Sequence, residues 1–317
     1  MRILITGGSG FIGSHIAEHF HKQAEVVVLD NLRTGNIHNL SGLKLTFVKG
    51  CITDSKVLEK AMEGVHYVFH LAALVSVAES MANPLECARI NTLGHIKVLE
   101  AAAKAGVRKL VFASSAAIYG DNPIVPKLET MPPEPRSPYA MSKLDGEFYN
   151  ALFTRKCGLE TANIRFFNVF GPRQNPLGGY AAAVPIFIER ALNRQLITIY
   201  GDGEQTRDFI YVEDIVSALI FAATTPGLTG TYNAGYGQKT SINELGEMIS
   251  KSAGTTFKRE YLAERPGDVP HSLADASKLR TAGWQPKHDL RTGLSLTIEY
   301  ARMYGRLWKA SKHSPSK

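Results

Sequence analysis

The stretch ILITGGSGFIGSHIAEHF, from Ile3 to Phe20, joins an apolar run to a helical pattern through a cluster of glycines. Gly8, Gly10 and Gly13 fit the spacing GxGxxG, and with Gly7 in place of Gly8 the spacing is GxxGxxG. In either alignment the chain turns sharply after a strand, lets its backbone approach a pyrophosphate, and directs a helix N-terminus at the phosphates. The stretch therefore predicts a dinucleotide-binding strand, turn and helix.

An acidic residue follows where such motifs bind the adenosine ribose. Asp30 ends the apolar run EVVVLD, about 20 residues after Gly10. A carboxylate at this position binds the ribose and repels a 2′-phosphate, which favours NAD over NADP. Arg33 is near enough in the sequence to leave NADP open. The cofactor that we expect is NAD.

The first half of the chain alternates short apolar runs with helical patterns. The runs lack polar alternation, as strands buried on both faces should, and their alternation with helices predicts a parallel, doubly wound sheet. The expected strands are Arg2 to Thr6, Glu25 to Asp30, Leu43 to Val48, His66 to Ala72, Lys109 to Ser115, and a sixth within ETANIRFFNVFG. The expected helices include Phe11 to Lys22, Ser55 to Met62 and Thr92 to Ala105.

After Gly171 the pattern changes to a Gly/Pro-rich loop, a helix near 184–192, and strand patterns at LITIYG and RDFIYV. A further helix begins after a Ser241 cap. We expect an α/β protein with a Rossmann-type doubly wound parallel sheet and a smaller C-terminal α/β substrate-binding lobe. The expected divisions are an NAD-binding domain over 1–167, a mainly substrate-binding lobe over 168–305 with some segments returning to the large domain, and a flexible tail over 306–317.

The composition describes an ordinary soluble globular protein of 317 residues, with 44% hydrophobic and 21% charged residues. No run approaches the roughly 18 apolar residues of a membrane span, and the N-terminus has the pattern of a buried strand, not of a signal peptide. Three widely spaced cysteines favour a reducing cytoplasm. The net charge of +7 comes from scattered basic residues, so we expect neither nucleic acid nor membrane as a partner.

Histidines on the first helix are the one candidate for a metal site. His15 and His19 lie four residues apart, with His21 near them. Metalloprotease helices carry HExxH, whereas Glu18 in HIAEH stands at a different position. We expect a helix with several histidines and no metal.

The segment SPYAMSK places Tyr139 four residues before Lys143. On a helix these positions share one face, and a lysine ammonium beside a phenol lowers its pKa, which starts near about 10. A tyrosine tuned in this way serves as a general base near neutral pH. The pair alone is a weak signal, because tyrosine and lysine meet at this spacing by chance in many chains.

Three features now coincide: the glycine loop with Asp30, the segment FASSAAIYG, and YAMSK. Together they resemble the extended short-chain dehydrogenase/reductase family, in its NAD-dependent epimerase/dehydratase group. Within it the sequence looks most like the UDP-galactose (UDP-glucose) 4-epimerases, from Met1 to about Trp284. The resemblance implies that Tyr139 takes a hydroxyl proton from the sugar while NAD takes a hydride.

The resemblance assigns roles residue by residue. It implies a catalytic set of Ser115, Tyr139 and Lys143, in which Ser114 is the alternative to Ser115. Cofactor-binding residues would be Gly7, Gly10, Phe11, Ile12, Asp30, Asn31, Ile52, Leu71, Ala72, Ala73, Asn91, Tyr139 and Lys143. Substrate-binding residues would be Ser115, Tyr139, Asn168, Tyr200, Arg207, Arg265, Asp268 and Ser272.

Departures from the family pattern narrow the choice of reaction and substrate. Related dehydratases carry an acidic pair where this chain has Ala116 and Ala117, so an acid and a base for eliminating water are missing. Cys51 replaces the aspartate that usually contacts the adenine amino group, which weakens that hydrogen bond. Ser272 replaces the bulky residue that can crowd the 2-substituent of the sugar, so UDP-GlcNAc and UDP-GalNAc are expected substrates alongside UDP-Glc and UDP-Gal.

The predicted function is NAD-dependent 4-epimerisation of a UDP-hexose through a transient 4-keto intermediate. The alternatives on the same fold are a UDP-uronate 4-epimerase and a nucleotide-sugar reductase; a non-catalytic NAD-sensing protein is a different class. Retention of the tyrosine and lysine argues against the last. Two helices, from Thr92 to Ala105 and from Tyr139 onward, resemble those of the family's dimer interface, so we expect a homodimer.

Overall fold

The computed structural model describes residues 1–176, 182–264 and 269–310. Within these residues, a seven-stranded parallel sheet forms the centre of the larger lobe. Its strands are β1 (Arg2–Thr6), β2 (Glu25–Asp30), β3 (Thr46–Lys49), β4 (Tyr67–His70), β5 (Lys109–Ser115), β6 (Glu160–Phe166) and β11 (Gly230–Ala234). The strand order β11-β6-β5-β4-β1-β2-β3 confirms the doubly wound class.

The order of the strands reverses at β1. Ile3 pairs with Val26 of β2 on one side and with Tyr67 of β4 on the other. In open sheets of this kind, ligands bind in the crevice outside the carboxyl ends of the strands, at such a switch point. The crevice therefore opens next to the glycine loop that follows β1.

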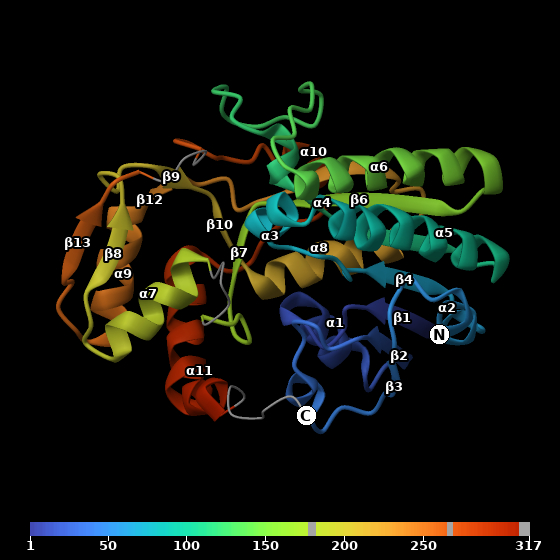
Figure 1. Ribbon diagram of the computed structural model, residues 1–317, viewed down its shortest axis with the longest axis horizontal. Coiled ribbons are helices and arrows are strands. Elements are labelled where there is room, and N and C mark those ends of the chain that lie inside the picture. Colours follow the sequence, from blue (N-terminus) through green and yellow to red (C-terminus); the bar gives the residue numbers. More distant parts are fainter. Residues whose placement is uncertain (177–181, 265–268, 311–317) are drawn as a thin grey trace.

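Helices cover both faces of the sheet (Figure 1). One face packs on α1 (Phe11–Phe20) and α8 (Val212–Thr224), and the other on α2 (Ser55–Met62), α5 (Gly94–Lys104) and α6 (Pro138–Cys157). Because both faces are covered, the strands are uniformly apolar, and Ile3, Leu4 and Ile5 are all 0% exposed.

The smaller lobe follows the predicted order of elements (Figure 1). Strands β8 (Ile197–Tyr200) and β13 (Arg259–Leu262) pair in parallel, and β9 (Thr206–Arg207) pairs antiparallel with β12 (Thr240–Ser241). Its helices include α7 (Ala183–Leu192), α9 (Ile242–Ala253) and α11 (Leu290–Ala310), whereas the short α10 (Ser277–Thr281) packs against β11 of the central sheet. Ser241 caps α9 as predicted, in a capping box with Glu244.

Several boundaries differ from the sequence prediction. The strand expected through 160–171 breaks after Phe166: Phe167 still bonds to Ala234, but the next segment, β7 (Asn168–Phe170), pairs with β10 (Phe209–Tyr211). The helix expected from Thr92 begins earlier, as a π-helix over Ala88–Leu93 that continues into α5. The short helices α3 (Val77–Ala82) and α4 (Pro84–Cys87) precede it.

The sequence predicted that some segments of the second half return to the large domain but did not identify them. Helix α8 and strand β11 return to the central sheet from the second half of the chain, and α11 runs to Ala310, beyond the start of the expected tail. Short 3₁₀ helices span Ile37–Leu40 and Ala116–Tyr119. No helix in the described part of the chain is both long and apolar enough to cross a membrane.

Candidate active site

The glycine loop between β1 and α1 lies tightly against the loop that follows β4. Gly7 has φ +71°, and a Cβ there would come within 2.8 Å of the backbone nitrogen of Ala72. A Cβ on Gly13 would come within 2.4 Å of the Gly7 carbonyl oxygen, so α1 starts directly on the loop. Phe11 and Ile12 form the first turn of that helix. The packing of the loop therefore requires glycine at both positions, as in loops that place a helix N-terminus at a pyrophosphate.

The Asp30 carboxylate is held at the rim of this loop. Its Oδ2 accepts from the Ser9 backbone N–H at 3.0 Å, and its Oδ1 accepts from Leu32 N–H at 2.8 Å. Each carboxylate oxygen retains a second lone pair for a ribose hydroxyl. The buried Ser9 hydroxyl has no partner, and a Cβ on Gly35 would come within 2.6 Å of it. An unpaired hydroxyl, an oriented carboxylate and a cradle of small residues fit the adenosine end of NAD.

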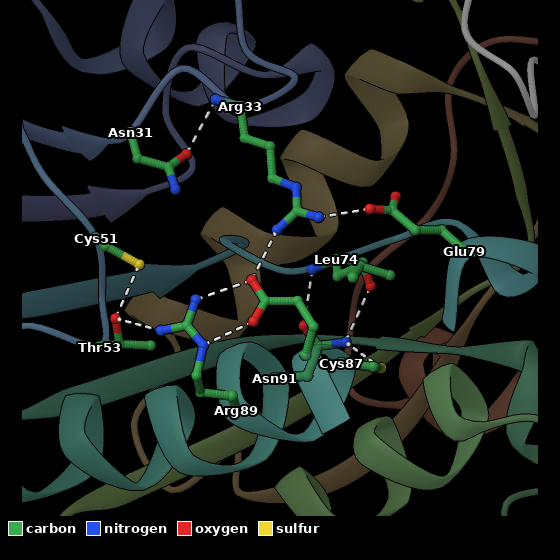
Figure 2. A network of polar contacts seen from close by, with 10 residues as sticks. Asn31, Arg33, Cys51, Thr53, Leu74, Glu79, Cys87, Arg89 and Asn91 are labelled. Carbon is green, nitrogen blue, oxygen red and sulfur yellow. Dashed lines mark hydrogen bonds and ion pairs between the residues drawn. The ribbon is translucent and has the colours of Figure 1, made fainter. Parts of the chain in front are cut away.

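The region around Arg33 bears on the choice of dinucleotide. Its guanidinium donates to Glu79 at 2.5 Å and to Glu86 at 3.1 Å (Figure 2). Its positive charge is therefore balanced by carboxylates instead of facing a 2′-phosphate, which agrees with NAD. Cys51 accepts a 3.1 Å hydrogen bond from the Thr53 hydroxyl. The Ile52 side chain is buried against Gly94 of α5, so it faces the core.

The predicted cofactor loop after β4 is clamped by Asn91 (Figure 2). Leu71 and Ala72 donate their backbone N–H groups to the carbonyl and hydroxyl oxygens of Thr6. Asn91 accepts from Leu74 N–H at 2.7 Å, and its amide donates to the Leu74 carbonyl at 2.9 Å. The same amide nitrogen lies 3.0 Å from the Ser142 hydroxyl of α6. Asn91 thus joins this loop to the helix that carries Tyr139.

Tyr139 and Lys143 lie on the first turns of α6, as the spacing predicted. Ser137 caps the helix, and its side chain accepts from the Ala140 N–H. The Lys143 ammonium donates to the Ala113 carbonyl at 2.7 Å and lies 5.8 Å from the centroid of the Tyr139 ring. Ser115, at the end of β5, lies near enough to Tyr139 for its side chain to lower the pKa of the phenol. The three predicted catalytic residues therefore meet at the carboxyl edge of the sheet.

The pKa of Tyr139 moves in the opposite direction from the sequence prediction. Burial raises the pKa of the phenol, and the Ser115 side chain offsets only part of this rise. Burial also lowers the pKa of Lys143 to about 8. The lysine does not provide the expected lowering, because its ammonium is turned to the Ala113 carbonyl and the phenolate has little access to water.

The structure distinguishes the two adjacent serines of β5. Ser114 is buried and donates to Glu147 at 2.5 Å, and Glu147 forms a paired ion bridge with Arg165. Ser115 accepts from the Ala117 N–H at 3.1 Å, which leaves its own proton for Tyr139 or a ligand. Ser114 belongs to a buried structural network, whereas Ser115 faces the site. The network residues were not predicted, since nothing in their local sequence marks them as partners.

Two buried histidines beside Lys143 were also missed. The rings of His70 and His95 stack with centroids 4.9 Å apart. His70 lies 2.6 Å from the Thr6 hydroxyl, and His95 lies 2.9 Å from Asn150 Oδ1. Burial lowers the pKa of His95 to about 3 and that of His70 well below its ordinary value. Both rings are neutral packing groups at physiological pH.

The predicted substrate residues come from the smaller lobe and its connections. Asn168 of β7 donates its side-chain amide to the Asp208 carbonyl at 3.1 Å. Arg207 lies on β9, next to Thr206, whose backbone bonds to both Pro270 and Ser272. Arg207 and Ser272 are therefore brought together, while Tyr200 ends β8. Arg265 and Asp268 lie outside the described residues.

The histidine pattern of α1 has a structural explanation. His15 Nε2 lies 3.0 Å from the Pro172 carbonyl, and burial lowers the pKa of His15 to about 4. Among the residues that the structure describes, no group of three or more His, Cys, Asp or Glu side chains is arranged to hold a metal ion.

Comparison with known proteins agrees with this geometry. A family model described as the NAD dependent epimerase/dehydratase family matches residues 3–235. The chain belongs to this family. A UDP-glucose 4-epimerase of Mycolicibacterium smegmatis is 38% identical, over 95% of this chain and 99% of its own.

Two solved structures are similar over nearly their whole length. A UDP-N-acetylglucosamine 4-epimerase of Methanobrevibacter ruminantium, in complex with UDP-N-acetylmuramic acid, has a TM-score of 0.92 at 40% identity and covers 95% of this chain and 98% of its own. A UDP-glucose 4-epimerase of Thermus thermophilus, in complex with NAD, has a TM-score of 0.89 at 39% identity and covers 95% and 99%. Members of this family use NAD, and the glycine loop and Asp30 of this chain fit it.

Proposed function

We propose that this protein catalyses NAD-dependent 4-epimerisation of a UDP-hexose. The observation that carries the proposal is the meeting of Ser115, Tyr139 and Lys143 at the carboxyl edge of the dinucleotide-binding sheet. The neighbouring Ala116 and Ala117 offer no acid or base for removing water. This agrees with an epimerase rather than a dehydratase, as do the 4-epimerases to which the chain is similar.

In this proposal, Tyr139 takes the proton of the sugar's 4-hydroxyl. It returns the proton after the 4-keto sugar has rotated to present its opposite face. Ser115 donates a hydrogen bond to the 4-oxygen and keeps its proton, while its own oxygen accepts from Ala117. When bound, NAD would supply the hydride acceptor and donor for the sugar's fourth carbon. Lys143 would hold the nicotinamide ribose, and its ammonium lies 5.8 Å from the centroid of the Tyr139 ring. Gly7, Gly10 and Asp30 hold the pyrophosphate and the adenosine ribose.

The nucleotide end of the substrate is anchored by the smaller lobe. Arg207 and Arg265 would hold the diphosphate, Tyr200 the uracil and Asp268 the uridine ribose, while Asn168 contacts the diphosphate from β7. Guanidinium groups suit this role because they form paired hydrogen bonds with phosphate oxygens. Firm anchoring of UDP leaves the hexose free to rotate between the two hydride transfers. The small side chain of Ser272 leaves room for an N-acetyl group at the sugar's second carbon.

We further propose a homodimer formed through α5 and α6. Met141, Phe148 and Leu152 follow one another at helical spacing on α6 and are 48%, 60% and 50% exposed. Leu93, just before α5, is 55% exposed. A large apolar stripe on a helix is typical of an interface. A cytoplasmic location agrees with three cysteines that are all free thiols.

The proposal is tested by incubating purified protein with UDP-GlcNAc, UDP-Glc or UDP-glucuronate, without an external reductant, and separating the C4 epimers by chromatography. We expect UDP-GalNAc or UDP-Gal to form with wild-type protein and to be lost with Tyr139→Phe, which keeps the ring and removes the hydroxyl. If epimers formed only from UDP-glucuronate, the protein would be a UDP-uronate 4-epimerase instead. A net redox product would indicate a nucleotide-sugar reductase.

A further inference from the structure

The loops after β2 and β4 stand on either side of the glycine loop, because these strands are the two neighbours of β1. Arg33 lies in the loop after β2. Glu79 lies on α3 and Glu86 on α4, both of which follow β4. An interaction between Arg33 and these carboxylates therefore spans the carboxyl end of β1, where the phosphates and adenosine of a dinucleotide lie in this fold.

Four charged side chains make this connection. Arg33 donates to Glu79 at 2.5 Å and to Glu86 at 3.1 Å. Arg89 forms a paired contact with the same Glu86 carboxylate, at 2.7 and 2.8 Å. Figure 2 shows the Arg33 side chain extending from the loop of Asn31 towards Glu79. Arg89 lies below them in this view, next to Thr53.

The network also reaches the loop after β3. Arg89 donates to the Thr53 hydroxyl at 3.3 Å, and that hydroxyl donates to Cys51 at 3.1 Å. The three loops that border the adenosine half of the groove are therefore joined by one chain of polar contacts (Figure 2). In this network Glu86 stays ionised across the physiological range, because the hydrogen bonds from Arg89 and Arg33 lower its pKa to about 2.

The loop geometry holds Arg33 in place. Leu32 adopts φ 61°, an unusual value for a leucine, and its N–H donates to Asp30 at 2.8 Å. The Arg33 N–H donates to Asn31 Oδ1 at 3.0 Å. The turn that directs Asp30 towards the ribose site thus also directs Arg33 across the groove.

We propose that Arg33, Glu79, Glu86 and Arg89 form an ionic latch over the adenosine half of the NAD groove, which slows release of NAD. This inference rests on the proposed function, which requires the cofactor to remain bound between turnovers. Single exposed ion pairs contribute little, but a network with paired arginine–carboxylate geometry contributes more. The side chains are 34–50% exposed, so salt reaches and screens them.

The test measures how fast NAD is released after the purified holoprotein is diluted into about 0.05 M or about 0.5 M NaCl. These concentrations bracket the range over which salt screens exposed charges. Chromatography separates free from bound nucleotide. In the wild type, release accelerates with salt. Arg33→Met keeps the apolar stem and removes the charge; at low salt its release is about five- to tenfold faster than in the wild type, with little salt dependence. Arg33→Lys restores a salt-dependent, slower release.

Lys104→Met is the matched control, because it breaks an exposed 2.8 Å ion pair with Glu59 outside the groove. It should release NAD like the wild type. If Arg33→Met does not fold, Glu79→Gln tests the same pair. Release from the Arg33→Met or Glu79→Gln protein at the wild-type rate, or wild-type release unaffected by salt, would overturn the latch.

The epimer assay on the same samples separates this inference from the proposed function. Epimerisation with salt-independent release of NAD contradicts the latch alone. Slow, salt-sensitive release in a protein that forms no epimer contradicts the proposed function and supports the latch.

Discussion

The Ser115 side chain acts on the Tyr139 phenol and lowers its pKa, although the two residues come from different elements, the end of β5 and the first turn of α6. The adjacent Ser114 makes no such contact and is bonded to Glu147 at 2.5 Å inside the protein. Two neighbouring serines of the same strand therefore have separate roles, one at the site and one in the core.

Replacing each serine by alanine separates these roles. Ser115→Ala should lower kcat by about 10²-fold with little change in stability, because a hydrogen-bond donor to the reacting oxygen is lost. Ser114→Ala should leave kcat within a few-fold and lower the free energy of unfolding by about 1 kcal/mol, because Glu147 loses a buried partner. Steady-state kinetics and denaturant titration measure both. A larger loss of kcat in Ser114→Ala would contradict the assignment.

Bound NAD⁺ should lower the pKa of Tyr139. Burial raises this pKa above its ordinary value of 10.0. A cationic nicotinamide ring near the phenol favours the phenolate, so the pKa falls, and phenolate appears at lower pH. Ultraviolet absorbance of tyrosinate during a pH titration, taken as the difference between wild type and Tyr139→Phe, measures it. Equal pKa values with NAD⁺ and NADH would show that this charge does not act on Tyr139.

Acid should destabilise the protein through its buried histidines. The pKa of His95 is about 3 in the folded chain, against an ordinary value of 6.5. Between these values the unfolded chain binds the proton and the folded chain does not, so stability falls as the pH drops from about 6.5 towards 3.

His95→Gln removes this titration while keeping an amide donor for Asn150. From pH 7 to pH 5, the wild type should lose about 2 kcal/mol more of its unfolding free energy than the variant does. Denaturant titrations at the two pH values measure the difference. Identical losses in both proteins would mean that His95 is not held neutral.

The size of residue 272 should set the sugar preference. Ser272→Tyr adds an aromatic ring where the resemblance locates the sugar's 2-substituent. We expect kcat/KM for UDP-GlcNAc to fall more than about tenfold, with UDP-Glc changed by less than about threefold, since a clash discriminates against the larger group. Ser295→Tyr, on the exposed face of α11, is the control. An equal fall for both sugars would argue against a gate at this position.

The sequence predicted the first strands closely, because each element there is set by local patterns. Strand bounds at Arg2–Thr6, Glu25–Asp30 and Lys109–Ser115 match the prediction, as does the helix Ser55–Met62. Uniform apolar runs identify strands buried on both faces, and turn residues mark their ends. The glycine loop and the Tyr–Lys pair could be located in the same way, because each is defined by residues close together in the sequence.

The parts that were missed depend on contacts between distant segments. Strand β11 joins the sheet beside β6, and nothing within GTYNA indicates that partner. The Ser114–Glu147–Arg165 network involves β5, α6 and β6, so no single segment reveals it. The predicted direction of the Tyr139 pKa shift was wrong. The spacing of the two residues indicates a nearby lysine, but it shows neither the burial of the phenol nor the carbonyl that accepts from Lys143.

The central claim is that the hydrogen on the sugar's fourth carbon leaves and returns as hydride. The most direct test is to incubate the holoprotein with UDP-hexose deuterated at that carbon, in ordinary water, and to follow the label in both epimers by mass spectrometry. The account predicts that the new epimer keeps its deuterium at the fourth carbon, with no label released to water. Loss of the deuterium to solvent during epimerisation would show proton abstraction from carbon and would contradict the account.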